Sequence, residues 1–297
     1  MPTVVVPVSS YGTVTLSYTF ADNDPALLKP LTIGMKLAHG SVGAGYYDDV
    51  KVTYSKSSGI GAVAGNLIAG NANHGVRFGS QAHGNLVQGN WIGVNRVGNT
   101  ALGQGGHGVF VEGSNNIVGV FGDGSRDASE GNLISGSAYA GVLVYGTSEN
   151  QVAGNRIGTN SLGTSSIANG DHGVYVVGGA NNLIGTNGDG VADTLERNLL
   201  SGNTGSGVLL NWTSNNRVAG NFIGTKADAM AALPNTGNGI YIAGRSLNNI
   251  LGTDSSNDAW NANERNLISG NSIYGVHVWG GEGAKGTVIA GNWIGLN

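Results

Sequence analysis

The sequence predicts an all-β chain, most of which is a parallel β-helix of about seven turns. A Gly-Val pair, with Gly-Ile once in its place, recurs seven times at spacings of 32 to 36 residues, and a fixed period of this size is typical of a repeat array. Two columns of asparagine recur with it. The apolar pieces between them are too short for helices and alternate as strands do. Three such pieces per turn, stacked in register, give a parallel β-helix.

The Gly-Val pairs mark the first strand of each turn, which alternates apolar residues with other residues. Because side chains alternate across a strand, we expect the residue after each glycine, and the second residue beyond it, to point into the core. The pairs begin at Gly75, Gly108, Gly141, Gly173, Gly207, Gly239 and Gly275.

Asparagines begin the second and third strands. Asparagine suits tight corners because it tolerates the left-handed region and its amide bonds to nearby backbone. Stacked asparagines are therefore expected to form hydrogen-bonded ladders. The second column contains Asn85, Asn116, Asn150, Asn182, Asn216 and Asn249, and the third Asn66, Asn90, Asn132, Asn155, Asn198, Asn221, Asn266 and Asn292.

Each turn has more residues than its strands need, and the surplus forms loops at two alternating places. One series follows the third strand, as in VNRVGNTALGQGG, and the other follows the second strand, as in NGDGVADTLER. The chain therefore divides into long repeats at roughly 66–131, 132–197 and 198–265, plus part of a fourth. We expect the β-helix to occupy 66–297 and to continue beyond the chain end, because an uncapped end is an exposed edge.

The pattern NLISGN…GVxV…NxVxGNxIGT…ERNLISGN resembles the right-handed parallel β-helix repeats of the pectate-lyase-like superfamily. It is most similar to the Gly/Asn-rich repeats of large bacterial surface and secreted proteins, and the resemblance covers about four-fifths of the chain. It implies a right-handed coil and an extracellular or cell-surface location. It does not imply one activity, because the superfamily holds lyases, hydrolases, tail spikes, adhesins and inert stalks.

Composition excludes several classes of protein. The 297 residues include 54 glycines and no cysteine, so a disulfide scaffold and a thiolate site are excluded. The net charge of −4, with no cluster of lysine and arginine, argues against a nucleic-acid partner. No apolar stretch reaches membrane-spanning length, and the first ten residues lack the basic start of a signal peptide.

Residues 1–54 lie outside the repeat and are predicted to be β-rich, because 14–20, 31–37 and 50–54 alternate as strands do. Residues 47–54 are similar to the closing strand of carbohydrate-binding jelly rolls. The segment is therefore either the C-terminal part of such a module or a cap on the first turn. Residues 55–65 form the junction.

The strands show no catalytic constellation. A glycoside hydrolase needs two carboxylates at one bond, and Glu112 is the lone outward strand carboxylate. A lyase needs a base near metal-holding carboxylates, but Arg77 and Arg156 have no acidic neighbour in their columns. His172 follows Asp171, but the equivalent position in other turns holds residues of many types. This indicates a corner that accepts most side chains and is not a catalytic position. We assign no catalytic residue.

One loop has the spacing of a calcium site. Oxygen-bearing side chains at Asn187, Asp189, Asp193 and Glu196, with a glycine at the bend, match much of an EF-hand-like loop. Against this, Gly185 stands where an aspartate is expected, and flanking helices are missing. The alternative is a Gly-Asp turn in which Glu196 forms a surface pair with its neighbour Arg197, and Glu264 of the next repeat forms one with Arg265. Calcium is the one cofactor that the sequence suggests.

Two columns of outward strand positions are unusually apolar. An apolar stripe on the outside of a protein is either covered by other parts of the chain or forms a binding surface. Either the long loops cover it, through Leu102, Leu162, Ile167, Leu195, Leu233 and Trp260, or it is a surface that binds a glycan or another partner. The candidate sugar-binding residues are Phe110, Tyr175 and Tyr241 in the Gly-Val column, and Trp91 and Phe222 in the column after the third asparagine.

The sequence therefore favours a structural or adhesive extracellular module that binds polysaccharide on an outward aromatic face. The alternative is a polysaccharide lyase or glycoside hydrolase of the pectate-lyase-like superfamily. Neither the glycan nor a protein partner can be named from the sequence.

Overall fold

A computed structural model describes residues 65–254, 256, 258–281 and 283–295. The chain divides into two units, Met1–Ala62 and Val63–Asn297. The predictions for 1–54 and for nearly all of the junction lie outside the described residues.

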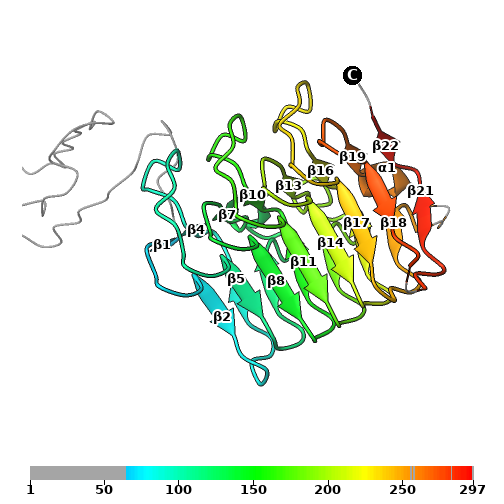
Figure 1. The fold of residues 1–297 in the computed structure, drawn as a ribbon, viewed down its shortest axis with the longest axis horizontal. Coiled ribbons are helices and arrows are strands. Elements are labelled where there is room, and N and C mark those ends of the chain that lie inside the picture. The colour runs from blue at the N-terminus through cyan, green and yellow to red at the C-terminus, as the bar shows by residue number, and fades with distance from the viewer. Residues whose placement is uncertain (1–64, 255, 257, 282, 296–297) are drawn as a thin grey trace, which may run out of the picture. The chain divides into compact units, whose positions relative to one another are not determined.

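Three sheets of parallel strands make up the second unit (Figure 1). Sheet 1 contains β1 (Leu67–Ile68), β4 (Trp91–Ile92), β7 (Leu133–Ile134), β10 (Arg156–Ile157), β13 (Leu199–Leu200), β16 (Phe222–Ile223), β19 (Leu267–Ile268) and β22 (Trp293–Ile294). Sheet 2 contains β2 (Val76–Phe78), β5 (Val109–Val111), β8 (Val142–Tyr145), β11 (Val174–Val177), β14 (Val208–Asn211), β17 (Ile240–Ala243) and β20 (Val276–Val278). Sheet 3 contains β3 (Leu86–Val87), β6 (Ile117–Gly119), β9 (Gln151–Ala153), β12 (Leu183–Gly185), β15 (Arg217–Ala219), β18 (Ile250–Gly252) and β21 (Val288–Ala290).

The chain visits the sheets in the fixed order 1, 2, 3, and each strand pairs in parallel with the equivalent strand of the next turn. In sheet 2 the register aligns the Gly-Val positions, so that Val142 lies beside Val174 and Val174 beside Val208. The predicted fold class, an all-β parallel β-helix, is confirmed.

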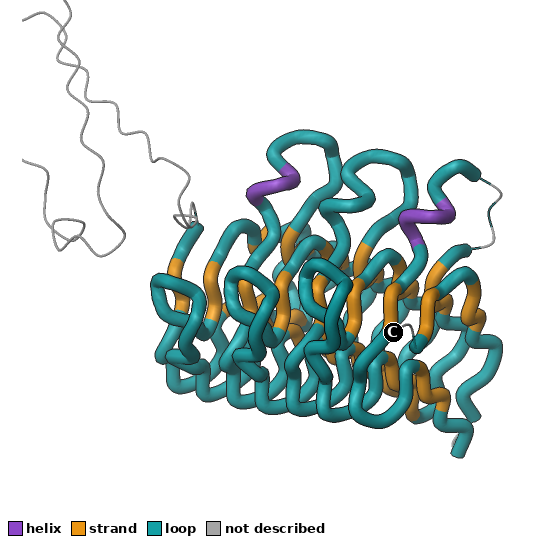
Figure 2. Tube along the Cα trace, turned by 90° about the horizontal axis from the view of Figure 1, so that it is seen from above, coloured by secondary structure: helices purple, strands orange, loops and turns teal. Residues whose placement is uncertain are grey.

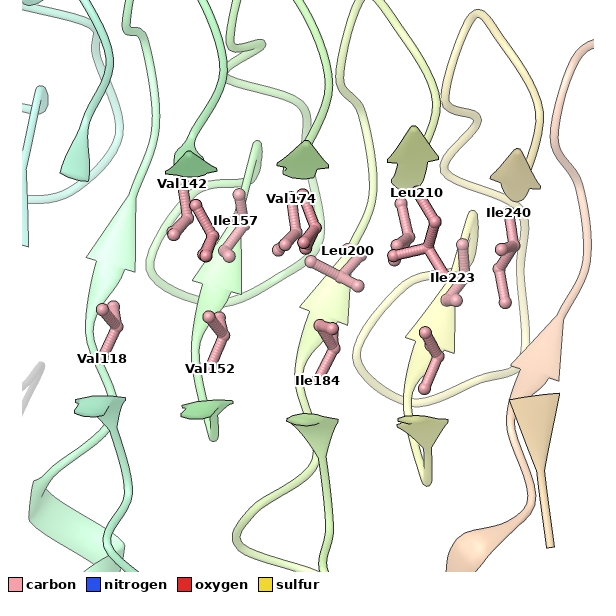
Figure 3. Packing of buried hydrophobic residues seen from close by; sticks show 14 of the residues in the cluster. Val118, Val142, Val152, Ile157, Val174, Ile184, Leu200, Leu210, Ile223 and Ile240 are labelled. Atoms are coloured by element: carbon pink, nitrogen blue, oxygen red, sulfur yellow. The ribbon is translucent and has the colours of Figure 1, made fainter. Parts of the chain in front are cut away.

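The core runs along the axis of the coil as stacked columns of aliphatic side chains, two from sheet 2 and one each from sheets 1 and 3 (Figure 3). Val142 from sheet 2, Val152 from sheet 3 and Ile157 from sheet 1 meet inside one turn, and all three are buried. Each buried valine, leucine or isoleucine contributes about 1.5–3 kcal/mol. The inward positions expected from alternation in sheet 2 are confirmed.

Both predicted asparagine ladders are present. At Asn182, which is 2% exposed, Oδ1 accepts the backbone N–H and the side-chain amide of Asn150, at 2.9 and 3.1 Å. Its own Nδ2 donates to Asn216 Oδ1 at 3.0 Å and to the Thr147 carbonyl at 3.1 Å. The ladder thus satisfies polar groups of buried corners on neighbouring turns.

A third ladder, at the corner between sheets 1 and 2, was not predicted. Asn169 Nδ2 donates to Asn203 Oδ1 at 3.0 Å, and the pattern continues to Asn235 and Asn271. The signal in the sequence is the position four residues before each Gly-Val glycine, which holds Asn71, Asn169, Asn203, Asn235 and Asn271. Gln104 and Ser137 take this position in two turns, so the column is not purely asparagine.

The two loop series leave the coil at different places (Figure 2). The second series carries the helical turns, a 3-10 turn at Asp127–Ser129 and the helix α1 (Asn261–Glu264). The first series folds onto sheet 1, where Val94 and Ile167 pack on Leu133 beside Trp91. The prediction that loops cover an outward apolar column therefore applies to the column on sheet 1. Of the predicted covering residues Ile167 is buried, whereas Leu102, Leu162, Leu195 and Trp260 are exposed.

Within the described part of the chain, no helix has the length and apolar character needed to cross a membrane.

Candidate functional site

The outer surface of sheet 2, here called the sheet 2 face, gathers rings from three columns of residues. The first column lies just before the strands and contains His74, His107, Ala140, His172, Ser206, Asn238 and Tyr274. The second is the predicted column of Arg77, Phe110, Leu143, Tyr175, Leu209, Tyr241 and His277. The third, at the strand ends, includes Tyr145, Val177, Asn211 and Ala243.

The first cluster of rings occupies the N-terminal turns of the face. His74 and His107 stack at 5.2 Å between ring centroids, and Phe110 lies 4.9 Å from His74 and 5.7 Å from His107. The exposed rings of Tyr139 and Tyr145 extend the cluster on either side, at 5.5 Å from His107 and 6.2 Å from Phe110.

Two further clusters follow along the axis. His172 and Tyr175 meet edge to face at 5.5 Å. Farther on, Tyr241 stacks on His277 at 4.9 Å, and Tyr274 meets the same histidine at 5.0 Å. Phe110, Tyr175 and Tyr241 are all half-buried, so part of each ring faces solvent.

Leucines separate the three clusters in the second column. Leu143 and Leu209 are each 7% exposed and lie between Phe110 and Tyr175 and between Tyr175 and Tyr241. Neighbouring strands are about 4.8 Å apart, so the three predicted rings recur at roughly twice that distance. The predicted row of aromatic residues is present, and a nearly buried leucine lies between each ring and the next.

The histidines also hold the corners of the coil. His172 Nδ1 accepts the Ser206 N–H at 2.8 Å, and His107 Nδ1 accepts the Ala140 N–H at 3.2 Å. Because Nδ1 is an acceptor, each ring carries its proton on Nε2. Burial lowers the pKa of both histidines, which keeps them neutral at pH 7. The histidine corner thus carries a structural hydrogen bond, which the mixed column did not reveal.

Trp212 was missed by the sequence reasoning. It follows the last residue of β14, is 53% exposed and has φ of 55°, a left-handed conformation rare for a bulky residue. Glycine occupies the same position in the neighbouring turns, at Gly146, Gly178 and Gly244. The signal in the sequence was a tryptophan that replaces glycine at this point of the repeat.

Formal charges on the strands of this face are paired. Arg77 contacts the Glu112 carboxylate at 2.7 Å and lies 5.7 Å from the centre of the Phe110 ring. Arg77 has no acidic neighbour in its own column, as the sequence indicated, but it pairs with a carboxylate of the adjacent column. Glu112 directly follows β5, the strand next to β2, and the long Arg77 side chain reaches across to it. Asp171 lies 3.2 Å from His172 Nε2.

The other two predicted sugar-binding residues belong to sheet 1 and are not brought together with the aromatic row. Trp91 packs beside the loop cluster around Leu133. The Arg197 guanidinium lies 4.3 Å from the centre of the Phe222 ring. Both rings therefore already have partners from the chain itself.

The predicted calcium residues lie in one loop, where they bond to the loop's own donors. The buried Asp193 accepts hydrogen bonds from Thr186 Oγ1, the Gly190 N–H and Asn263 Nδ2, at 3.1, 3.2 and 2.9 Å. The exposed Asp189 accepts the Val191 N–H at 2.8 Å and the Asn187 amide at 3.0 Å. Across the described residues, no three histidine, cysteine or acidic side chains are grouped as a metal site.

Glu196 closes this loop and is fully buried. Its Oε2 accepts the Asn187 N–H at 3.1 Å, whereas Oε1 has no hydrogen-bond partner among the described residues. Burial raises the pKa of Glu196 to about 7. In the next repeat the equivalent Glu264 contacts Arg217 at 2.5 Å, where β9 has Gln151 instead.

The predicted surface pairs between Glu196 and Arg197 and between Glu264 and Arg265 are therefore wrong. The glutamates turn inward to accept backbone N–H groups at the start of their loops, while the Arg197 and Arg265 guanidinium groups lie near the Phe222 and Trp293 rings.

No family model matches this sequence, and no curated protein matches it. Among solved structures, the chain is similar to the periplasmic alginate epimerase AlgG, with 15% sequence identity and a TM-score of 0.44. The alignment covers 76% of this chain and 44% of that one, so the chain spans less than half of that protein's length. This chain is a parallel β-helix protein. The likeness assigns no activity to it.

Proposed function

We propose that this chain is an extracellular or cell-surface β-helix module that binds an extended polysaccharide along the sheet 2 face. The observation that carries the proposal is the row of three ring clusters, centred on Phe110, Tyr175 and Tyr241, on alternate strands of sheet 2 (Figure 1).

Aromatic rings suit sugars because a pyranose presents an apolar C–H face bordered by hydroxyl groups. A half-exposed ring offers that face apolar area, while a tyrosine hydroxyl or a histidine Nε2–H can meet the hydroxyls. Asn211 Nδ2 donates to the Tyr175 hydroxyl at 3.3 Å, which orients that group at the centre of the row.

The repeated arrangement suits a polymer better than a small ligand. Each ring contact is weak, but contacts on one chain add because the second and third are intramolecular once the first has formed. The columns that place the rings also fix their direction, so the row runs along the axis of the coil.

Polysaccharide cleavage, the alternative raised by the sequence, draws less support from this face. Glycoside hydrolysis requires two carboxylates on either side of the scissile bond. The described strands and corners of the face supply Glu112 and Asp171, which come from turns two apart, and Glu112 is already bound by Arg77. We therefore propose binding as the function of this surface. The extracellular location belongs to the same proposal and is supported by the repeat's resemblance to secreted proteins.

A polysaccharide array probed with the full chain and with a Tyr175→Ala/Tyr241→Ala variant tests this function. We expect the parent to bind at least one polysaccharide and the variant to lose at least tenfold in affinity. Trp91→Ala/Phe222→Ala is the matched control, because it removes two rings from sheet 1 and should leave binding unchanged. Equal binding by the parent and the Tyr175→Ala/Tyr241→Ala variant would refute the assignment.

A further inference from the structure

We propose that the sheet 2 face selects neutral polysaccharides over polyuronates. This inference rests on the proposed function and names the class of ligand. A site for a polyuronate needs cations free to meet its carboxylates, and arginine is the side chain best suited to that task.

The arginine on the strands of this face is already occupied. Arg77 makes two contacts with one Glu112 oxygen, through Nε and through a terminal nitrogen, each at 2.7 Å. The pair neutralises its own net charge next to Phe110, so a sugar carboxylate would meet a guanidinium whose charge Glu112 already offsets.

His74, His107 and His172 add hydrogen-bond donors and no positive charge at neutral pH. His74 Nδ1 accepts the His107 N–H at 3.0 Å, and His107 and His172 accept a backbone N–H in the same manner. A protonated ring would lose that bond, since both of its nitrogens are donors. Burial is also the main reason that the pKa of His74 is lowered.

Asp171 makes the centre of the face negative. Its carboxylate is 38% exposed and contacts Nε2 of the neutral His172, so its charge is not cancelled. A carboxylate accepts hydrogen bonds from sugar hydroxyls and repels another carboxylate. The net charge of the whole chain, −4, acts in the same direction.

The chemistry of the face is thus a row of rings with hydroxyl, amide and Nε2–H groups, one exposed carboxylate and a self-paired arginine. Each of these groups serves an uncharged sugar chain, and the arrangement disfavours a polyanion.

Affinity electrophoresis of the full chain in gels that contain dextran, xylan, glucomannan, mixed-linkage β-glucan, polygalacturonate or alginate tests the selectivity. We expect retardation by at least one neutral polymer and at least tenfold weaker binding of both polyuronates. A polyuronate that binds as well as the best neutral polymer would overturn this inference and leave the proposed function standing. Retardation by none of the polymers would overturn the proposed function itself.

Glu112→Gln tests the charge pair, because it frees Arg77 and keeps the shape of the side chain. We expect this variant to gain at least threefold in polygalacturonate affinity, a gain that falls as salt is added. Glu149→Gln is the control, since it changes the net charge equally at an exposed corner away from the strands of the face. An equal gain in both variants, or a gain in neither, would contradict the role of the Arg77–Glu112 pair.

Discussion

At the scale of single residues, asparagine side chains form the hydrogen bonds that join the corners of successive turns. Every tight corner buries backbone N–H and carbonyl groups, and the amide is short enough to reach the next turn and carries both a donor and an acceptor. In the ladder through Asn150, Asn182 and Asn216, each Oδ1 binds two N–H groups of the preceding rung. The side chain thus takes part in the link between turns.

Asn182→Ala is therefore expected to lower the free energy of unfolding by about 1–3 kcal/mol, because the backbone N–H of Asn150 loses its acceptor in a buried corner. Thermal and denaturant unfolding measure the change. Asn73→Ala is the control, since this asparagine is exposed, and it should shift stability by less than about 0.5 kcal/mol. An Asn182→Ala midpoint equal to that of the parent would remove the ladder from the account of stability.

Trp212 is retained in a backbone conformation that suits glycine. A bulky residue in the left-handed region costs on the order of 1–3 kcal/mol, and such outliers gather at functional sites. Its exposed ring lies at the edge of the sheet 2 face, beside Asn211, whose amide donates to Tyr175.

We expect Trp212→Gly to weaken polysaccharide binding at least threefold while it changes the free energy of unfolding by less than about 1 kcal/mol, because glycine adopts this conformation without strain. Trp260→Gly, at an exposed tryptophan on a long loop, is the matched control and should bind as the parent does. Full affinity in the Trp212→Gly variant would show that the ring lies outside the site.

At the scale of elements, the second loop series differs between repeats in how its buried glutamate is neutralised. Glu264 has Arg217, and Glu196 has Gln151 at the equivalent place in the turn below. Since burial raises the pKa of Glu196 from its ordinary 4.5 to about 7, the folded chain holds this proton more tightly than the unfolded chain.

The sign of the pH dependence follows from that difference. The stabilising contribution is complete below pH 4.5 and is lost as pH rises through about 7, where the buried group ionises. One pKa unit corresponds to about 1.4 kcal/mol, so the full effect is about 3 kcal/mol. Glu196→Gln, which stays neutral, should therefore gain about 2–3 kcal/mol relative to the parent between pH 5 and pH 8.

Glu264→Gln is the control for this pH series. It removes a carboxylate that contacts Arg217, so we expect it to destabilise the fold at both pH values. Parallel curves for the parent and Glu196→Gln between pH 5 and pH 8 would show that Glu196 does not titrate in this range.

Calcium binding by the loop that contains Asn187, Asp189, Asp193 and Glu196 stays a prediction. Binding would require the carboxylates to exchange their present hydrogen bonds for the ion, so millimolar affinity is the expected range. Titration calorimetry with calcium should then give heat that Asp189→Asn abolishes, and the midpoint of unfolding should rise with calcium. No heat at millimolar calcium would leave the loop as a Gly-Asp turn.

At the scale of the whole molecule, the sequence predicts the coil much better than the site. Seven Gly-Val pairs set the register of sheet 2, and the inward Val142, Val174 and Val208 follow directly from that register. Repetition averages out local ambiguity, because an error at one turn is corrected by the turns on either side. Features present once, such as the strained Trp212, have no such support.

The site depends on distances across columns, which a linear pattern does not give. Alternation placed Phe110, Tyr175 and Tyr241 outward, but it did not show that His74, His107 and Tyr145 join Phe110 in one cluster. Nor did it distinguish this face from sheet 1, where loops pack on the equivalent stripe. The fold of a loop over a sheet depends on contacts between turns that spacing alone does not encode.

The crystal structure of the full chain with a bound fragment of the polysaccharide that binds most tightly tests the central claim most directly. The account predicts an extended sugar chain along sheet 2, with sugar rings against Phe110, Tyr175 and Tyr241 and none on sheet 1. A fragment ordered over Trp91 and Phe222, or among the long loops, would contradict it.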